Sequence, residues 1–201
     1  MKNTATRDKL ITTGAELIAQ QGYNATGINA VLNTCGVPKG SFYHYFSSKE
    51  DFGLAVIERF GEEYDADLAA LLEDASRDPF ERLRLYFARG RAYMSNCNHQ
   101  TGCLIGNLGQ ELSGQSDTFR DALDGVFKRW EQRFAACIEA AQAQGLIEPT
   151  LPAEALGSFI LSGWEGAILR AKTLKSVAPM EQFEKILFEC VLGTVGAQPR
   201  H

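Results

Sequence analysis

The sequence predicts an all-α fold, with a short N-terminal three-helix module over residues 1–47 and a larger helical domain over residues 48–201. Three observations support this prediction. Apolar residues recur at helical spacing in nearly every segment. Glycine, proline and capping residues separate those segments. The alternating pattern of a strand nowhere extends beyond four residues.

Length and composition limit the class of protein. Of the 201 residues, 45% are apolar and 22% are charged, which provides enough apolar surface for a folded core. The sequence has no run of about 18 uncharged apolar residues, and its start lacks the hydrophobic segment of a signal peptide. We therefore expect a soluble cytoplasmic protein.

The three helices of the N-terminal module are short. In the first, apolar residues recur at helical spacing up to Gly22, a residue suited to end a helix. The second is closed by Gly36, and Thr26 is placed to cap its start. Pro38 takes the favoured first position of the third helix, over residues 39–46. The apolar residues that define the first two helices are Leu10, Ile11, Ala15, Leu17, Ile18, Ile28, Val31 and Leu32.

Further helices are expected in the larger domain. Ser47 and Ser48, with Glu50 and Asp51 three residues later, form two overlapping capping boxes. Asp78, followed directly by a proline, marks the next start. The expected helices cover residues 48–73, 79–96, a short stretch within 101–114, 116–144, 152–174 and 179–195.

The second and third helices are joined by a tight turn at Gly36 and Val37. This is the geometry of a helix-turn-helix, in which the later helix lies in the major groove of DNA. Phe42 and Phe46 are four residues apart on one face of the third helix, and that face is expected to pack on the first two helices.

The remaining surface of the third helix has the chemistry of a DNA-reading face. Lys39 supplies charge, Ser41 and Tyr43 supply hydroxyl groups, and Gly40 allows close approach of the backbone; His44 shares this surface. The competing interpretation is that the aromatic run is core. That run holds four aromatic residues and a histidine on about one and a half turns, more than a module of this size can bury.

The charge distribution fits a nucleic-acid partner at one end of the chain. The net charge is −5, but residues 1–50 carry +2 and the remaining residues carry −7. A basic module can meet phosphate while an acidic body stays in solvent.

Three segments together resemble the DNA-binding signature of the TetR family: residues 22–26 (GYNAT), 36–46 (GVPKGSFYHYF) and 48–50 (SKE). The resemblance implies a homodimer that binds a palindromic DNA operator and releases it when a small molecule enters the C-terminal domain. It also implies that Lys39, Ser41, Tyr43 and His44 contact DNA, with Thr26 and Lys49 on phosphates. Gly27, Ile28 and Asn29 depart from the family pattern, which often has a second hydroxyl residue there.

The larger domain is expected to sense an effector, which is a small molecule or an electrophile. Aromatic residues could line a pocket between helices, or they could be ordinary core. They are Tyr64, Tyr86, Tyr93, Phe127, Trp130, Phe134 and Trp164. The long helix from Ser48 leads out of the DNA-binding module, so we expect it to act as the lever that changes the separation of the two modules in a dimer.

Cys103 is the principal candidate for a sensing thiol. It stands at the first turn of a short helix, where the helix dipole and free amides favour a thiolate. The Gly102-Cys103-Leu104 segment is similar to one in the TetR-family subgroup that senses electrophiles and oxidants. The alternative is an inert buried thiol. Cys97 is a second candidate, and the remaining cysteines, which lie on apolar helix faces, are interpreted as structural: Cys35, Cys137 and Cys190.

The last two helices combine small and apolar residues, which allows another helix to approach closely. In the resembled family this pair doubles into a four-helix dimer interface. Packing within one chain would leave the same pattern. The small residues are Gly157, Ser158, Ser162, Gly163, Gly166 and Ala167, and the apolar ones are Leu156, Phe159, Ile160, Phe183, Ile186, Leu187 and Val191.

Two other functions compete with DNA binding. A cysteine-dependent enzyme would need a base near its thiol, and His99 near Cys103 is the sole such pair, because His44 lies on the DNA-reading helix and His201 ends the sequence. A helical scaffold protein would show no preference for DNA sequence. The odd number of cysteines, without a close pair, indicates neither a disulfide framework nor a metal site, and no cofactor is expected.

Overall fold

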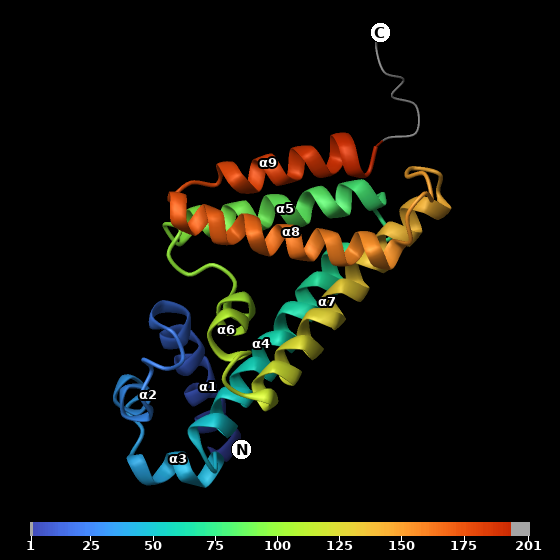
Figure 1. Ribbon diagram of the computed structural model, residues 1–201. Helices are drawn as coiled ribbons and strands as arrows, with labels where there is room; N and C mark the ends of the chain where they lie inside the picture. Colours follow the sequence, from blue (N-terminus) through green and yellow to red (C-terminus); the bar gives the residue numbers. More distant parts are fainter. Residues whose placement is uncertain (1, 194–201) are drawn as a thin grey trace. The chain divides into compact units, whose positions relative to one another are not determined.

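The computed structural model describes residues 2–193, and helices account for most of that range (Figure 1). The described chain divides into two compact units. One contains the residues up to Tyr64 together with 103–126, and the other contains 65–102 together with the residues from Phe127 onward. The helices are α1 (Lys2–Gln21), α2 (Ile28–Cys35), α3 (Lys39–Tyr45), α4 (Lys49–Leu72), α5 (Pro79–Asn96), α6 (Leu104–Leu112), α7 (Asp117–Ala143), α8 (Ala153–Leu174) and α9 (Ala178–Ile186).

The first unit packs α1, α2, α3 and the start of α4 around an aromatic core, with α6 against α1. Phe42 and Phe46 are 0% and 2% exposed, and both contact Phe52 from α4, with ring centres 5.4 and 5.1 Å apart. The prediction that these two residues form the buried face of the third helix is confirmed. Burying three aromatic rings anchors this short helix, because α3 has too few residues to be stable alone.

The glycine signals end their helices as expected. Gly22 and Gly36 adopt positive φ values of 86° and 64°, which a residue without a Cβ reaches at little cost. Two capping expectations are wrong. Gly27, not Thr26, is the N-cap of α2, and Pro38 is the N-cap of α3 instead of its first helical residue.

Hydrogen bonds to serine and aspartate side chains cap the starts of α4 and α5, as the sequence predicts. The Ser48 hydroxyl oxygen accepts from the Asp51 amide at 3.0 Å, and the Asp51 carboxylate accepts from the Ser47 amide at 2.8 Å. Asp78 accepts from the Glu81 amide at 3.0 Å, with Pro79 at the first position of α5. Each bond satisfies an amide that the helix itself leaves without a partner.

In the second unit, α5, α8 and α9 lie side by side (Figure 1). Their shared core is aromatic, and Trp164 of α8, which is 1% exposed, lies at its centre. Its ring centre is 4.8 Å from that of Phe87 and 6.0 Å from that of Phe183. A Cβ at Gly90 would lie 2.6 Å from the Trp164 ring, so α5 approaches α8 closely because this position has no side chain.

The last helix differs from the prediction of one helix over residues 179–195. α9 ends at Ile186 and a π-helical turn follows over Leu187–Val191, where the Leu192 amide donates to the Leu187 carbonyl oxygen at 2.8 Å. Leu187 and Phe188, at the start of this turn, are buried. Val195, the expected end, lies outside the described residues.

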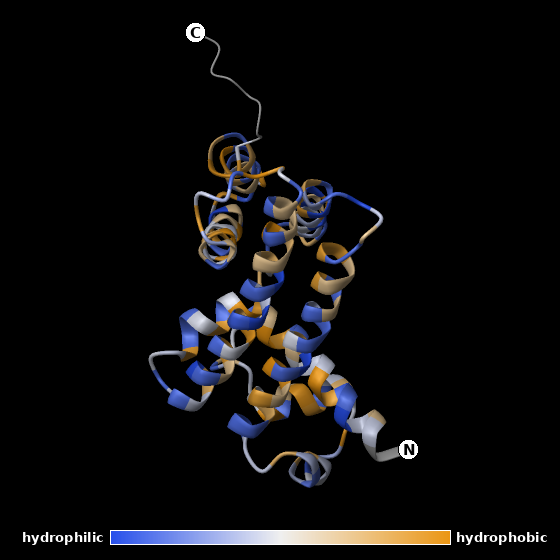
Figure 2. Ribbon diagram, turned by 90° about the vertical axis from the view of Figure 1, so that its right-hand side faces the viewer, coloured by the Kyte–Doolittle hydropathy of each residue, from blue (hydrophilic) through white to orange (hydrophobic). Residues whose placement is uncertain are grey.

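Hydrophilic and hydrophobic residues alternate along the long helices, as expected of amphipathic helices that bury one face (Figure 2). In the part of the chain that the structure describes, no helix has the length and apolar character needed to cross a membrane.

Candidate DNA-binding surface and sensing cysteines

The outer face of α3 carries the side chains that the sequence singled out for DNA contact. Tyr43 is 56% exposed, Lys39, Gly40 and His44 are exposed, and Ser41 is half-buried. Phe42, on the opposite side, fixes the orientation of the helix on its core. A rigid helix that presents a cation, hydroxyl groups and an imidazole matches the donors used to read base edges and phosphates.

Two other predicted phosphate contacts are occupied within the protein. Thr26 is 2% exposed, and its hydroxyl donates to the Gly22 carbonyl oxygen at 2.6 Å. Lys49 Nζ donates to the carbonyl oxygens of Tyr23 and Asn24, at 2.8 and 3.3 Å. Both side chains therefore hold the turn between α1 and α2, and contact of either with phosphate remains a prediction.

Sequence reasoning missed Glu111, a half-buried residue near the end of α6. Its carboxylate accepts hydrogen bonds from the amides of Tyr23 and Asn24, at 2.9 and 2.7 Å. The Asn24 side-chain amide also donates to Gln115 at 3.4 Å. No local pattern could have indicated these contacts, because the partners are almost ninety residues apart in the sequence.

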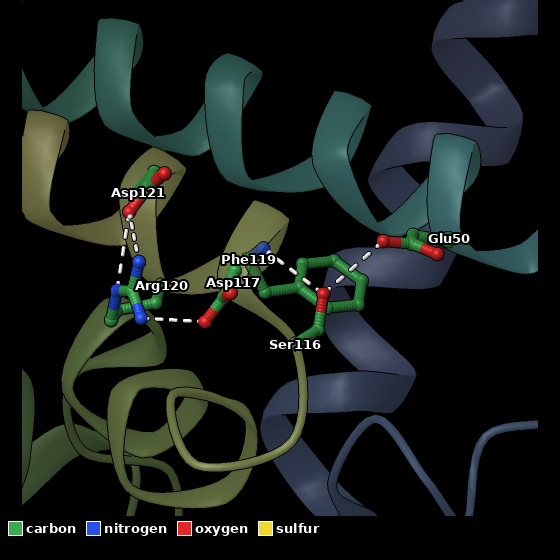
Figure 3. A network of polar contacts seen from close by, with 6 residues as sticks. All are labelled: Glu50, Ser116, Asp117, Phe119, Arg120 and Asp121. Carbon is green, nitrogen blue, oxygen red and sulfur yellow. Dashed lines mark hydrogen bonds and ion pairs between the residues drawn. The ribbon is translucent and has the colours of Figure 1, made fainter.

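A second polar link joins the start of α7 to the start of α4. The Ser116 hydroxyl caps α7 by accepting from the Phe119 amide at 3.3 Å, and it donates to the Glu50 carboxylate at 3.2 Å (Figure 3). In the same view Arg120 pairs with Asp117 and Asp121 on the exposed side of α7. The segment from α6 to α7 thus bonds to the turn before α2 and to the start of α4, the two helices that flank α3 in the chain.

Cys103 lies where the sequence placed it, at the start of a short helix. It is the N-cap of α6, and its sulfur accepts from the Gly106 amide at 3.4 Å. The thiol is half-buried. An amide donor at a helix N-terminus stabilises a thiolate more than a thiol, which is the environment of a reactive cysteine.

Cys97, the C-cap of α5, has an environment with stronger polar contacts than expected. Partial burial acts to raise its pKa, but hydrogen bonds from the Thr101 hydroxyl and from the amides of Thr101, Gln100 and His99 outweigh burial, so the pKa lies below its usual value. Tyr93 and Lys172 hold this loop, through a 3.0 Å contact with the Thr101 hydroxyl and a 3.3 Å bond to its carbonyl oxygen.

The other cysteines differ from one another. Cys35 is buried and its thiol donates to the Val31 carbonyl oxygen. Burial raises the pKa of the Cys137 thiol to about 11. Both environments agree with a structural role. Cys190 does not: it is exposed on the π-helical turn.

The two aromatic residues proposed for effector sensing lie in different environments. Trp130 is 1% exposed and packs against Phe127, with ring centres 6.0 Å apart. Tyr93 is 53% exposed. Tyr86, Phe134 and Trp164 belong to the packed core of the second unit. A role of Tyr93 or Trp130 in ligand binding remains a prediction.

Comparisons with known proteins agree with the fold and with a DNA-binding regulator. The family model described as "Bacterial regulatory proteins, tetR family" matches residues 10–56. The model described as "Tetracyclin repressor-like, C-terminal domain" matches residues 79–187. The two matches do not overlap, and residues 57–78 lie between them.

Characterised relatives match over nearly the full chain. The transcriptional regulator AcuR of Cereibacter sphaeroides is 42% identical, over 88% of this chain and 80% of that protein. The HTH-type transcriptional repressor DhaR of Mycobacterium sp. (strain GP1) is 38% identical, over 96% of this chain and 95% of that protein.

Solved structures give the same result. The crystal structure described as the reduced form of E. coli NemR has a TM-score of 0.87 and 30% identity, covering 92% of this chain and 96% of that one. The regulatory protein TetR from Rhodobacter sphaeroides has a TM-score of 0.84 and 40% identity, covering 89% and 94%. The chain therefore belongs to the TetR family of DNA-binding transcriptional regulators.

Proposed function

We propose that this regulator is a homodimeric repressor that binds a palindromic operator through the outer face of α3 and releases it in response to a small molecule or an electrophile. The observation that carries the DNA-binding part is the division of α3 into two faces. Phe42 and Phe46 are buried, whereas Lys39, Tyr43 and His44 are exposed. A two-fold dimer with such helices reads half-sites about one helical turn apart, ~34 Å.

An exposed apolar strip on α8 supports the homodimer. Phe159 and Leu169 are 49% and 45% exposed, and Ser162 and Gly166 lie between them on the same face. A methyl group added at Gly166 would meet no atom within 4 Å, so this part of the strip is open to a second helix. Gly157 and Gly163, by contrast, are used within the chain, against α7 and Phe183.

The environment of Cys103 supports the electrophile part of the proposal. Its sulfur caps α6, and α6 belongs to the same compact unit as the DNA-reading helix. A bulky or polar group added to the sulfur would displace the Gly106 amide and disturb the first turn of the helix. Packed helices tend to switch between arrangements instead of deforming smoothly, so this disturbance would shift α6 as a unit.

Release requires that the effector favours a dimer whose two α3 helices no longer fit successive major grooves. Helix α4 is the proposed lever, since its residues contribute to both compact units. Spin labels introduced through an unnatural amino acid at position 34, on the exposed side of α2, would report the separation of the two modules. An unchanged mean distance and width on release would exclude this mechanism.

Selection of bound fragments from random duplex DNA tests the proposed function directly. A repressor of this type enriches a palindromic sequence. A scaffold protein enriches none. A cysteine-dependent enzyme would instead consume an electrophile through many turnovers without exhausting its thiol, which a stoichiometric sensor cannot do. Enrichment of a palindrome together with single-turnover labelling would support the repressor over both alternatives.

A further inference from the structure

We propose that Glu111 is a positioning residue for operator binding: its carboxylate holds the turn between α1 and α2 and thereby sets the orientation of the DNA-reading module on α6. Glu111 does not lie on α3, so we assign it no contact with DNA. This inference rests on the proposed operator binding. It assigns to Glu111 the contact through which α6 orients the DNA-reading module.

The contact is a two-point clamp. Glu111 Oε2 accepts from the Tyr23 amide at 2.9 Å, and Oε1 accepts from the Asn24 amide at 2.7 Å. Both carboxylate oxygens are therefore used by consecutive peptide groups, which fixes the direction as well as the distance of the turn. Charge-assisted bonds of this length are stronger than bonds between neutral groups.

Lys49 binds the same two residues through their carbonyl oxygens, with bonds of 2.8 Å to Tyr23 and 3.3 Å to Asn24. The positive charge of Lys49 and the negative charge of Glu111 attract each other across the turn. The amides of these two residues thus bind a carboxylate on α6, and their carbonyl groups bind an ammonium on α4.

The position of this turn determines where α2 begins. The Thr26 amide donates to the Tyr23 carbonyl oxygen at 3.1 Å, and the Thr26 hydroxyl donates to Gly22. A further bond, from the Val37 amide to the Leu32 carbonyl oxygen at 3.0 Å, closes the turn between α2 and α3. A displacement of the clamped peptides is therefore passed on to the start of α2 and, through α2, to the turn that leads into α3.

Helix α6 connects the clamp to the proposed sensing thiol. Cys103 caps its start, and Glu111 lies in its last turn, about 12 Å further along the helix axis. Four buried leucine and isoleucine side chains keep this short helix on its core, so a shift at one end moves the other. The buried residues are Leu104, Ile105, Leu108 and Leu112.

Because Glu111 is negatively charged, the two possible effects of removing it change operator affinity in opposite directions. Removing a negative charge from a DNA-binding protein ordinarily strengthens its binding, because phosphate repulsion falls. Loss of the clamp should weaken binding. Glu111→Gln keeps the size of the side chain but removes its charge. It also replaces one acceptor oxygen by an NH₂ donor, which would face the N–H donor of one of the two amides and could not accept its hydrogen bond.

The experiment compares Glu111→Gln and Glu111→Ala with two controls, Glu62→Gln on the exposed face of α4 and Gln110→Ala beside the clamp. Operator affinity is measured at several salt concentrations, and exchange of the Tyr23 and Asn24 amides is measured without DNA. We expect both Glu111 variants to raise the operator dissociation constant about tenfold or more, with faster exchange at these two amides. The slope of affinity against salt should stay at its wild-type value, because no phosphate contact is removed.

The controls should bind at least as tightly as the wild type. The proposal is wrong if Glu111→Gln binds as tightly as Glu62→Gln, or if the two amides exchange at the wild-type rate. Glu111→Gln alone tests both the operator affinity and the exchange of the two amides, even if Glu111→Ala folds poorly. Absence of any operator for the wild type would instead reject the proposed function, and the exchange measurement would still decide whether Glu111 holds the turn.

Discussion

Lys49 and Tyr23 are joined twice: the ammonium group donates to the Tyr23 carbonyl oxygen at 2.8 Å and lies 4.4 Å from the centre of the Tyr23 ring. Burial lowers the pKa of Lys49, and the nearby Glu111 carboxylate opposes that shift. Burial, with Glu50 and Glu111, raises the pKa of Tyr23 to about 12. Lys49 is therefore a cation that already has acceptors within the protein, and it must leave them to reach a phosphate.

The exposed face of α3 is predicted to supply the base and phosphate contacts. Tyr43→Ala should weaken operator binding by ~1–3 kcal/mol if the tyrosine touches a base edge. Lys39→Ala should weaken binding more evenly across sequences and reduce its salt dependence. Gln20→Ala, on the exposed side of α1, is the control. Wild-type affinity in both α3 variants, measured by fluorescence anisotropy, would contradict the assignment of this face.

Operator release by electrophiles is predicted to follow modification of Cys103. At pH 7.5 an alkylating agent should label Cys103 and Cys97 well before Cys137, whose pKa of about 11 leaves almost no thiolate. Mass spectrometry of briefly treated protein gives this order.

Serine variants separate the two candidate sensing cysteines. Cys103→Ser should bind operator and resist release, whereas Cys97→Ser should still be released. If Cys103→Ser responds to the electrophile as the wild type does, the thiol is a passive residue and an ordinary ligand-gated repressor remains.

The exposed strip on α8 and α9 is predicted to form the dimer interface. Phe159→Glu and Ile186→Glu place charges on side chains that are 49% and 47% exposed in the single chain. Each should raise the dimer dissociation constant about 30-fold or more, equivalent to ~2 kcal/mol. Leu85→Glu, at a 41% exposed position on α5, serves as the control and should leave the mass measured by light scattering unchanged. A dimer that survives both interface substitutions would place the interface elsewhere.

The ion pair of Asp65 with Arg133 is predicted to make stability depend on pH. Arg133 donates two bonds to the Asp65 carboxylate, at 3.0 and 2.8 Å, and these bonds hold the pKa of Asp65 below its usual value. Because the folded pKa is lower than the unfolded one, this stabilisation is present above pH ~4 and is lost as pH falls through the folded pKa.

Asp65→Asn should therefore lower the free energy of unfolding by about 1 kcal/mol at pH 7, and by progressively less as the pH approaches 3. The measurement is urea denaturation at a series of pH values. Asp67→Asn, which breaks an exposed pair with Arg89, is the matched control and should have a smaller effect with little dependence on pH. If Asp65→Asn lowered the free energy of unfolding by the same amount at every pH down to 3, the charge of Asp65 would not be the cause of the loss of stability.

The sequence by itself determined the helical class, most helix boundaries and the division of α3 into a buried and an exposed face. Local chemistry decides these features. The capping bonds of Ser48 and Asp78 form within three residues, and positive φ at Gly22 and Gly36 is favoured by the missing side chain at each position. The two faces of α3 follow from a four-residue spacing between Phe42 and Phe46.

Tertiary structure decided what depends on residues far apart in the chain. Glu111 has no local motif, and its role follows from two amides that folding brings to within 3 Å of it. Thr26 and Lys49 look like phosphate ligands in sequence, yet their polar groups bind backbone carbonyls of the adjacent turn. The lowered pKa of Cys97 depends on a loop that folds its own amides onto the sulfur. Hydrogen bonds and electrostatic interactions act over a few ångströms in space, so sequence spacing predicts them only where the chain keeps the partners close.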